Sequence, residues 1–352
     1  MSNLRWLKSW EFALLVALMV ELAVLGMINP AFLNVQNLLY STSDFVHVII
    51  AAVGLTLIIM TGGIDISGVS LMGLASIVLG LSFVAGAPIW LAVGVALAVG
   101  LLAGAFNGSV VANTDVNPLV ITLAMLFLYS GVATGLPTLL DMLGFKAYGA
   151  GGFEAYQYEG INGLPKSFTW FGTGRIGWLP MPLVVTLVLT LIAGWLMGHT
   201  RFGRFLQLIG VNAEAARHTG VPLKRTLITV YALNGLAAAV AGLVLTAYFT
   251  SARSDLGAEA LLNIITAVVL GGSSIYGGEG SVLGTFLAGL VLGYLRQGLL
   301  ALGITSDVVP VIVGALLIGS VAGRIGLAAL QRSRANRAAY ETERQAVAAN
   351  GE

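Results

Sequence analysis

The sequence predicts an all-α polytopic membrane protein with about ten transmembrane helices, some of them broken or re-entrant. Only 9% of the 352 residues are charged and 57% are hydrophobic, whereas a soluble domain carries roughly 25% charged residues. Apolar runs of about 20 residues, the length that crosses a bilayer core, spread along almost the whole chain. These observations exclude an ordinary cytosolic enzyme, a nucleic-acid-binding protein and a disordered chain. The absence of cysteine excludes disulfides, thiolate metal sites and thiol catalysis.

Ten low-charge runs are long enough, or nearly so, to form the spans. Glycine-rich turns at Gly62–Ser67 and Gly277–Ser281 separate adjacent runs with little room for a loop. We therefore expect broken or re-entrant segments at these turns, because irregular backbone at membrane depth is tolerated only where it is buried or lines a cavity. Similar apolar stretches follow both turns, which is compatible either with an internal repeat of the fold or with chance similarity. The expected spans are Phe12–Ile28, Phe45–Met60, Ile66–Val84, Ile89–Val111, Pro118–Leu136, Pro182–Gly198, Leu227–Phe249, Ala260–Ile275, Val282–Leu302 and Val308–Gly323.

The distribution of positive charge predicts the orientation. With ten spans and a cytoplasmic N-terminus, 12 of the 17 Lys and Arg residues face the cytoplasm, four face outside, and Arg296 lies near a helix end. Cytoplasmic segments carry the excess of basic residues in membrane proteins, so we expect both termini inside. The predicted organisation is a transmembrane domain over 1–330, with an external loop at 137–181 and a cytoplasmic loop at 199–226, followed by a cytoplasmic tail at 331–352.

Glycines at four-residue spacing predict close helix packing. Gly100, Gly104 and Gly108 form one such stripe, and Gly289 and Gly293 form a shorter one. Small residues let helix backbones approach each other in lipid. Contacts within the chain are the expected role, and a subunit interface is the alternative.

A small set of polar residues in or beside the spans is the candidate translocation pathway. Asp65 follows the Gly62-Gly63 turn, and we expect it to accept backbone N–H groups at the start of the next helix, with solute contact as the alternative. The neutral residues suit a hydroxylated solute, although hydrogen bonding between helices explains each of them equally well. The candidates are Gly62, Gly63, Asp65, Ser67, Asn117, Thr122, Asn234 and Tyr248.

The cytoplasmic loop contains the pattern of a short helix. Asn212 is a good N-cap, strong helix-forming residues follow it, and Gly220 with Pro222 ends the helix. A short helix surrounded by arginine is suited to docking another protein. The expected coupling residues are Arg204, Asn212, Glu214, Ala215, Ala216, Arg217 and Gly220.

These motifs resemble those of ABC importer permeases. Glu214-Ala215-Ala216, followed after three residues by Gly220, is similar to the E-A-A-x-x-x-G loop through which such permeases engage their ATPases. The run Gly62 to Ser67 resembles the GGID-[LI]-S signature of the ribose/xylose/galactose branch, and Val116–Leu123 and Ile265–Gly272 continue the match. The order Gly68-Val69 departs from the Val-Gly usual in the family. Within the branch, Ser41–Phe45 and Ser251–Gly257 are most similar to D-type permeases of autoinducer-2 importers, with rhamnose-type permeases next.

The resemblance implies a transport subunit of the bacterial inner membrane that is not itself an enzyme. The chain has no Gly-Lys dipeptide and hence no G-x-x-x-x-G-K-[ST] phosphate loop, so ATP hydrolysis would come from two cytoplasmic ATPase subunits. The other partners implied are a second, non-identical permease, a periplasmic solute-binding protein and membrane lipid, with no nucleic acid and no cofactor. The expected solute is autoinducer-2, with rhamnose or another monosaccharide as the alternative. A stand-alone secondary transporter is a further alternative, but it leaves the E-A-A loop unexplained.

Overall fold

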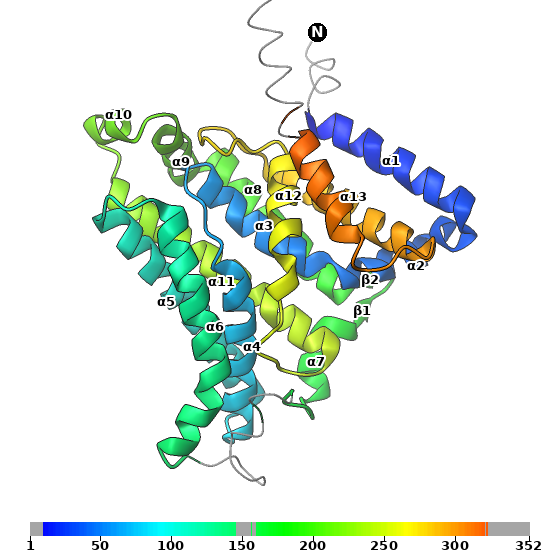
Figure 1. Ribbon diagram of the computed structural model, residues 1–352, viewed down its shortest axis with the longest axis horizontal. Coiled ribbons are helices and arrows are strands. Elements are labelled where there is room, and N and C mark those ends of the chain that lie inside the picture. Colours follow the sequence, from blue (N-terminus) through cyan, green and yellow to red (C-terminus); the bar gives the residue numbers. More distant parts are fainter. Residues whose placement is uncertain (1–9, 146–155, 157–159, 321, 323–352) are drawn as a thin grey trace, which may run out of the picture.

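The computed structural model describes residues 10–145, 156, 160–320 and 322, and within them the chain is almost entirely helical (Figure 1). The strands among these residues are a two-residue antiparallel pair, β1 (Arg175–Ile176) and β2 (Leu179–Pro180). The predicted tail 331–352 and part of the predicted external loop lie outside the described residues. The α-helices are α1 (Trp10–Ile28), α2 (Val35–Ser41), α3 (Val46–Ile59), α4 (Gly68–Val84), α5 (Ile89–Asn113), α6 (Pro118–Met142), α7 (Lys166–Thr173), α8 (Met181–His199), α9 (Arg201–Val211), α10 (Ala213–His218), α11 (Leu223–Phe249), α12 (Leu261–Leu270), α13 (Val282–Ala301) and a last helix at Val309–Ser320.

Each predicted span corresponds to one of these helices. Six of the described helices, α1, α5, α6, α8, α11 and α13, are long and apolar enough to cross a membrane. The segment Val35–Asp44 and α3 make a seventh if they count as one span, with a bend of 63° between them. The remaining three predicted spans correspond to shorter apolar helices: α4, α12 with the 3₁₀ turn η5 (Ala258–Ala260) before it, and Val309–Ser320. The all-α polytopic fold is therefore confirmed.

Three features differ from the predicted boundaries. Helix α6 continues through Pro137 to Met142, into the segment assigned to the external loop. Helix α12 ends at Leu270, because Gly271 and Gly272 turn the chain there. The break between Asp44 and α3 has no counterpart in the predicted spans, which place breaks only at the two glycine turns.

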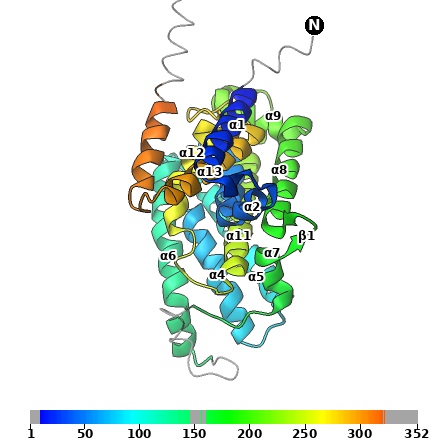
Figure 2. The same cartoon turned by 90° about the vertical axis from the view of Figure 1, so that its right-hand side faces the viewer.

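Helix α11 lies at the centre of the fold and packs against α5, α3 and α4. More than half of its most apolar stretch is buried, and α3 and α4 are buried along most of their lengths. Figure 2 shows α6 and α8 on opposite sides of the molecule. The wide apolar surfaces of α1, α5, α6 and α8 stay exposed in the single chain, as expected for helices that face lipid or another subunit.

The glycine stripe on α5 is the close contact with α11. A Cβ atom placed on Gly100 would lie 2.7 Å from the carbonyl oxygen of Gly235, and one placed on Gly108 would lie 2.7 Å from Cα of Ile228. On α13, a Cβ on Gly289 would lie 2.6 Å from the side chain of Ile49 on α3. The predicted packing role within the chain is confirmed for both stripes.

The described part of the predicted external loop folds back on the end of α11. Ile161 and Ala252 exchange two backbone hydrogen bonds of 2.9 Å. Gly172 of α7 lies directly against the backbone of Ala247 and Tyr248. This segment contains the short helix α7, which covers the end of α11.

Candidate functional site

The turn before α4 carries a buried carboxylate that joins four parts of the fold. Asp65 is 3% exposed. Its Oδ1 accepts hydrogen bonds from the backbone N–H (2.9 Å) and the hydroxyl (2.7 Å) of Ser67, and its Oδ2 accepts one from Nδ2 of Asn234 on α11 (3.0 Å). The predicted acceptance of a backbone N–H at the start of the helix is confirmed. A buried carboxylate needs such donors, because an unpaired charge in the interior is costly.

The hydrogen bonds continue from Ser67 to two further helices. Nδ2 of Asn107 on α5 donates to the Ser67 hydroxyl at 2.8 Å, and the Tyr129 hydroxyl on α6 donates to Oδ1 of Asn107 at 2.6 Å. Asn107 and Tyr129 are neutral polar residues inside apolar spans, and the structure joins them to the candidate residues Asp65, Ser67 and Asn234. We refer to Asp65, Ser67, Asn107, Tyr129 and Asn234 as the Asp65 network.

Two glycines and a threonine shape the same turn. Gly62 has a φ of +79°, a conformation that favours glycine. A Cβ on Gly63 would lie 2.9 Å from the Tyr231 hydroxyl. Thr122 on α6 donates to the carbonyl of Ile64 at 3.2 Å. Gly68 has no positive φ and a Cβ there would meet only ordinary contacts at 3.8 Å, so the inverted Gly68-Val69 pair does not disturb the turn.

The structure brings six of the eight candidate pathway residues together and separates two. Asn117 is exposed and caps α6, with its Oδ1 accepting the N–H of Leu119 at 2.9 Å. Tyr248 lies at the far end of α11. The void beside Asp65 and Asn234 measures about 10 Å³, which is room for one water at most. The Asp65 network therefore holds helices together and leaves no space for a solute in this conformation.

The predicted cytoplasmic helix is present as α10. Oδ1 of Asn212 accepts the N–H of Ala215 at 2.9 Å, which confirms the N-cap, and Gly220 ends the turn with a φ of +82°. Ala216 is buried against Ile209 and Val221. The other predicted coupling residues are exposed, namely Arg204, Glu214, Ala215 and Arg217. Helix α10 thus presents a polar surface and is anchored by one alanine.

Helix α9, which is not among the predicted elements, connects α10 to both glycine turns. Gly278 donates its N–H to the carbonyl of Met60 at 2.9 Å, which joins the two turns. A Cβ on Gly277 would lie 2.8 Å from the nitrogen of Gly62 and 2.9 Å from Cα of Gly210 on α9. We call Gly62, Gly210 and Gly277 the glycine junction. Three backbones therefore meet here, at the start of the turn that carries Asp65.

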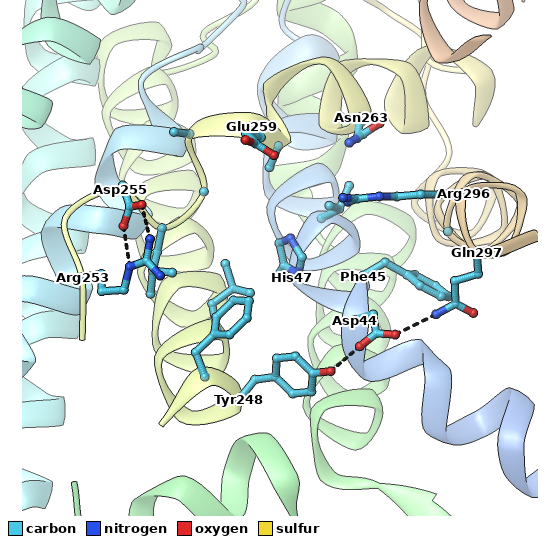
Figure 3. Close-up of a pocket in the computed structure, with 18 of the residues that line it drawn as sticks. Asp44, Phe45, His47, Tyr248, Arg253, Asp255, Glu259, Asn263, Arg296 and Gln297 are labelled. Carbon is cyan, nitrogen blue, oxygen red and sulfur yellow. Dashed lines mark hydrogen bonds and ion pairs between the residues drawn. The ribbon is translucent and has the colours of Figure 1, made fainter. Parts of the chain in front are cut away.

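A cavity of about 560 Å³ lies at the end of α11 that is remote from α10 (Figure 3). Tyr248 forms part of its wall and donates its hydroxyl to Oδ1 of Asp44. Nε2 of Gln297 on α13 donates to Oδ2 of Asp44 at 3.0 Å. These hydrogen bonds of Asp44 connect the bend before α3 to α11 and α13 in the wall of the cavity. Of the eight candidate pathway residues, Tyr248 alone lines this cavity.

Comparison with known proteins identifies the family. The model of the family described as branched-chain amino acid transport system / permease component matches residues 37–321. The chain is 48% identical over 317 residues to the autoinducer 2 import system permease protein LsrD of Klebsiella pneumoniae subsp. pneumoniae. The aligned region covers 90% of this chain and 91% of that relative. The LsrD proteins of Photorhabdus temperata and Yersinia enterocolitica are each 46% identical over 315 residues, with the same coverage. No solved structure matches the chain significantly. The chain therefore belongs to this family of multi-pass membrane permeases, whose members are transport components.

Proposed function

We propose that the chain is the transmembrane permease subunit of an ATP-driven importer that carries autoinducer-2 across the bacterial inner membrane. Support for the solute comes from relatives of 46–48% identity, over 90% of the chain, whose names describe autoinducer 2 import. The partners we propose are two cytoplasmic ATPases, a second and non-identical permease, and a periplasmic solute-binding protein.

The observation that carries the proposal is the path from α10 to the Asp65 turn. The exposed face of α10 suits contact with an ATPase surface, and Glu214 and His218 lie 3.9 Å apart on that face. Helix α9 immediately precedes α10 in the chain and reaches the glycine junction, where its Gly210 contacts the backbone of both broken-span turns. Movement of an ATPase against α10 would therefore reach the membrane-buried turns through backbone contacts, with no flexible side chain between.

The proposed orientation assigns each of these features to one side of the membrane. With both termini inside, the two glycine turns and α10 all fall on the cytoplasmic side. The bend at Asp44, the end of α11 and the start of α12 all fall on the outer side. Because the chain has no cysteine, single cysteines report their side directly. Asp307→Cys should react with an impermeant maleimide in intact spheroplasts. Thr219→Cys should react with it only after the spheroplast membrane has been opened. The reverse pattern would contradict the orientation.

Reconstitution tests the function. The complete complex is reconstituted in proteoliposomes, with binding protein and solute on one side of the membrane and ATP on the side of the ATPases. These proteoliposomes should accumulate autoinducer-2 only when ATP is hydrolysed. Glu214→Arg should abolish ATP-driven uptake, and the charge reversal Asp307→Arg, at an exposed carboxylate far from α10 in the chain, should not. Uptake that continues without ATPases would indicate a secondary transporter, and uptake of L-rhamnose in preference to autoinducer-2 would reassign the solute.

A further inference from the structure

The cavity at the outer end of α11 lies at a break in a span. The segment Val35–Asp44 meets α3 at 63°, and the break falls at Asp44 and Phe45, which are both in the cavity wall. Its volume of about 560 Å³ falls in the range of roughly 300–1,000 Å³ that is typical of small-molecule sites. Many transporters form their solute sites where a helix is discontinuous.

Two helices begin at this cavity. His47 and Val48, in the first turn of α3, line one side. Glu259 in η5 and Asn263 in the first turn of α12 line another. The N-terminus of a helix carries partial positive charge and favours oxygen atoms of a ligand. The cavity is therefore lined by helix starts on two sides.

Three polar side chains in the wall have no partner among the described residues. Nδ1 of His47 is buried and accepts and donates no hydrogen bond. Arg296 of α13 is half-buried and forms no ion pair within the described chain. The side chain of Asn263 likewise makes no hydrogen bond there. Figure 3 shows Arg296 extending from α13 across the cavity, between His47 and Asn263. Buried polar groups are normally satisfied, so the buried Nδ1 of His47 indicates a ligand. Arg296 and Asn263 are half-buried beside it and are free to contact the same ligand.

Most other charged side chains in the wall have partners within the protein. Arg253 and Asp255 form a two-point ion pair, with Nε to Oδ1 at 2.9 Å. Asp44 keeps its formal charge but accepts hydrogen bonds from Tyr248 and Gln297. With Arg296 and Glu259, the wall has charged groups of both signs and a small net charge. A cavity with both donors and acceptors suits hydroxyl groups, which donate and accept at once.

We propose that this cavity is a solute-binding site for a neutral, polyhydroxylated molecule of monosaccharide size, held by Arg296, His47 and Asn263. The rings of Tyr248 and Phe249 in the wall provide apolar surface for the carbon skeleton of the solute. The inference rests on the proposed function, because it places the solute of the same importer within this chain. It adds a site that the Asp65 network, which has no room for a solute, does not provide.

Blocking the cavity is the first test. Ala258 is exposed at the cavity wall, so Ala258→Trp fills the space without disturbing the core. Ala85→Trp is the matched control, since Ala85 is exposed beyond the end of α4 and outside the cavity. Arg296→Gln removes the charge, and Arg175→Gln is its control on the outer side. In proteoliposomes with the complete importer, we expect each cavity variant to lower ATP-driven uptake of autoinducer-2 at least tenfold, and each control to stay within twofold of the wild type.

Direct binding separates failure of this inference from failure of the proposed function. Equilibrium dialysis of labelled autoinducer-2 and L-rhamnose against the complex in nanodiscs needs neither ATP nor transport. We expect saturable binding that Ala258→Trp removes and Ala85→Trp retains. If the wild-type importer transports but the cavity variants match their controls in uptake and binding, the inference is overturned and the function stands. If uptake fails while cavity-dependent binding persists, the function is wrong and the site stands. Absence of saturable binding in the wild type overturns the site.

Discussion

Replacing Gly104 by alanine tests whether close backbone contact between α5 and α11 holds the fold together. Gly104 lies in the middle of the α5 stripe, and a Cβ placed there would lie 3.0 Å from Cα of Gly235 and still closer to the carbonyl of Tyr231. Both neighbours are backbone atoms of the central helix, so neither can rotate away. The two helices must separate to admit the methyl group.

The magnitude follows from a comparison with Gly94 on the same helix. A Cβ on Gly94 would meet nothing within 4 Å. Both substitutions gain about 0.5–1 kcal/mol from the better helix propensity of alanine. The difference between the two variants therefore isolates the packing cost, which is about 1–3 kcal/mol for overpacking a close contact. Gly94→Ala should be neutral or stabilising, and Gly104→Ala should be destabilising.

Unfolding of the purified chain in mixed micelles by sodium dodecyl sulfate, followed by circular dichroism, measures this difference. We expect the midpoint of Gly104→Ala to fall below the wild type and that of Gly94→Ala to equal or exceed it. Equal midpoints for the two variants would refute the reasoning, because they would mean that α5 and α11 do not rely on backbone contact at Gly104.

Three further predictions concern the network, the cap and the junction. Asn234→Leu leaves Oδ2 of Asp65 without its donor and should lower the free energy of unfolding by about 1–3 kcal/mol, measured in the same detergent titration; an unchanged midpoint would contradict the network. Asn212→Ala removes the α10 cap and should destabilise that helix by about 1 kcal/mol, seen as weaker co-purification of the ATPases, whereas Asn212→Ser should restore it. Gly277→Val places a side chain against Gly62 and Gly210 at a φ of +87°; we expect fewer solute molecules imported per ATP hydrolysed, and an unchanged ratio would remove the junction from coupling.

Local sequence patterns were sufficient to predict the helices of the ten apolar runs, the short helix α10 and the two glycine packing stripes. Low-charge apolar runs predict spans because lipid admits few charges, and each run corresponds to a helix. Four-residue glycine spacing predicted the α5–α11 contact, since residues at that spacing share one helix face. Asn212 predicted the start of α10, because capping depends on residues within one turn.

Features that depend on distant parts of the chain were not predictable in this way. Asp65 and Asn234 are 169 positions apart, and no local spacing pairs them. The bend at Asp44 has no proline or glycine to mark it, so the sequence places that break elsewhere. Arg296 lies near the end of an apolar run, where a cation ordinarily reaches the membrane surface. Only the packing of α13 against α3 reveals that it points into the cavity.

Two short helices connect the two ends of the molecule, and both begin at the cavity and end beside the glycine turns. Helix α3 begins at the cavity and ends beside Met60, which accepts the hydrogen bond from Gly278. Helix α12 also begins at the cavity and ends at the turn that leads to Gly277. At 1.5 Å per residue they span about 21 Å and 15 Å. Helix α3 is buried along almost its whole length and α12 along about half of it, and we expect each unbroken helix to move as a unit. A displacement of α9 at the glycine junction is therefore expected to shift the starts of both helices. Those starts carry His47 and Asn263, so closure of the ATPases would change the cavity wall itself.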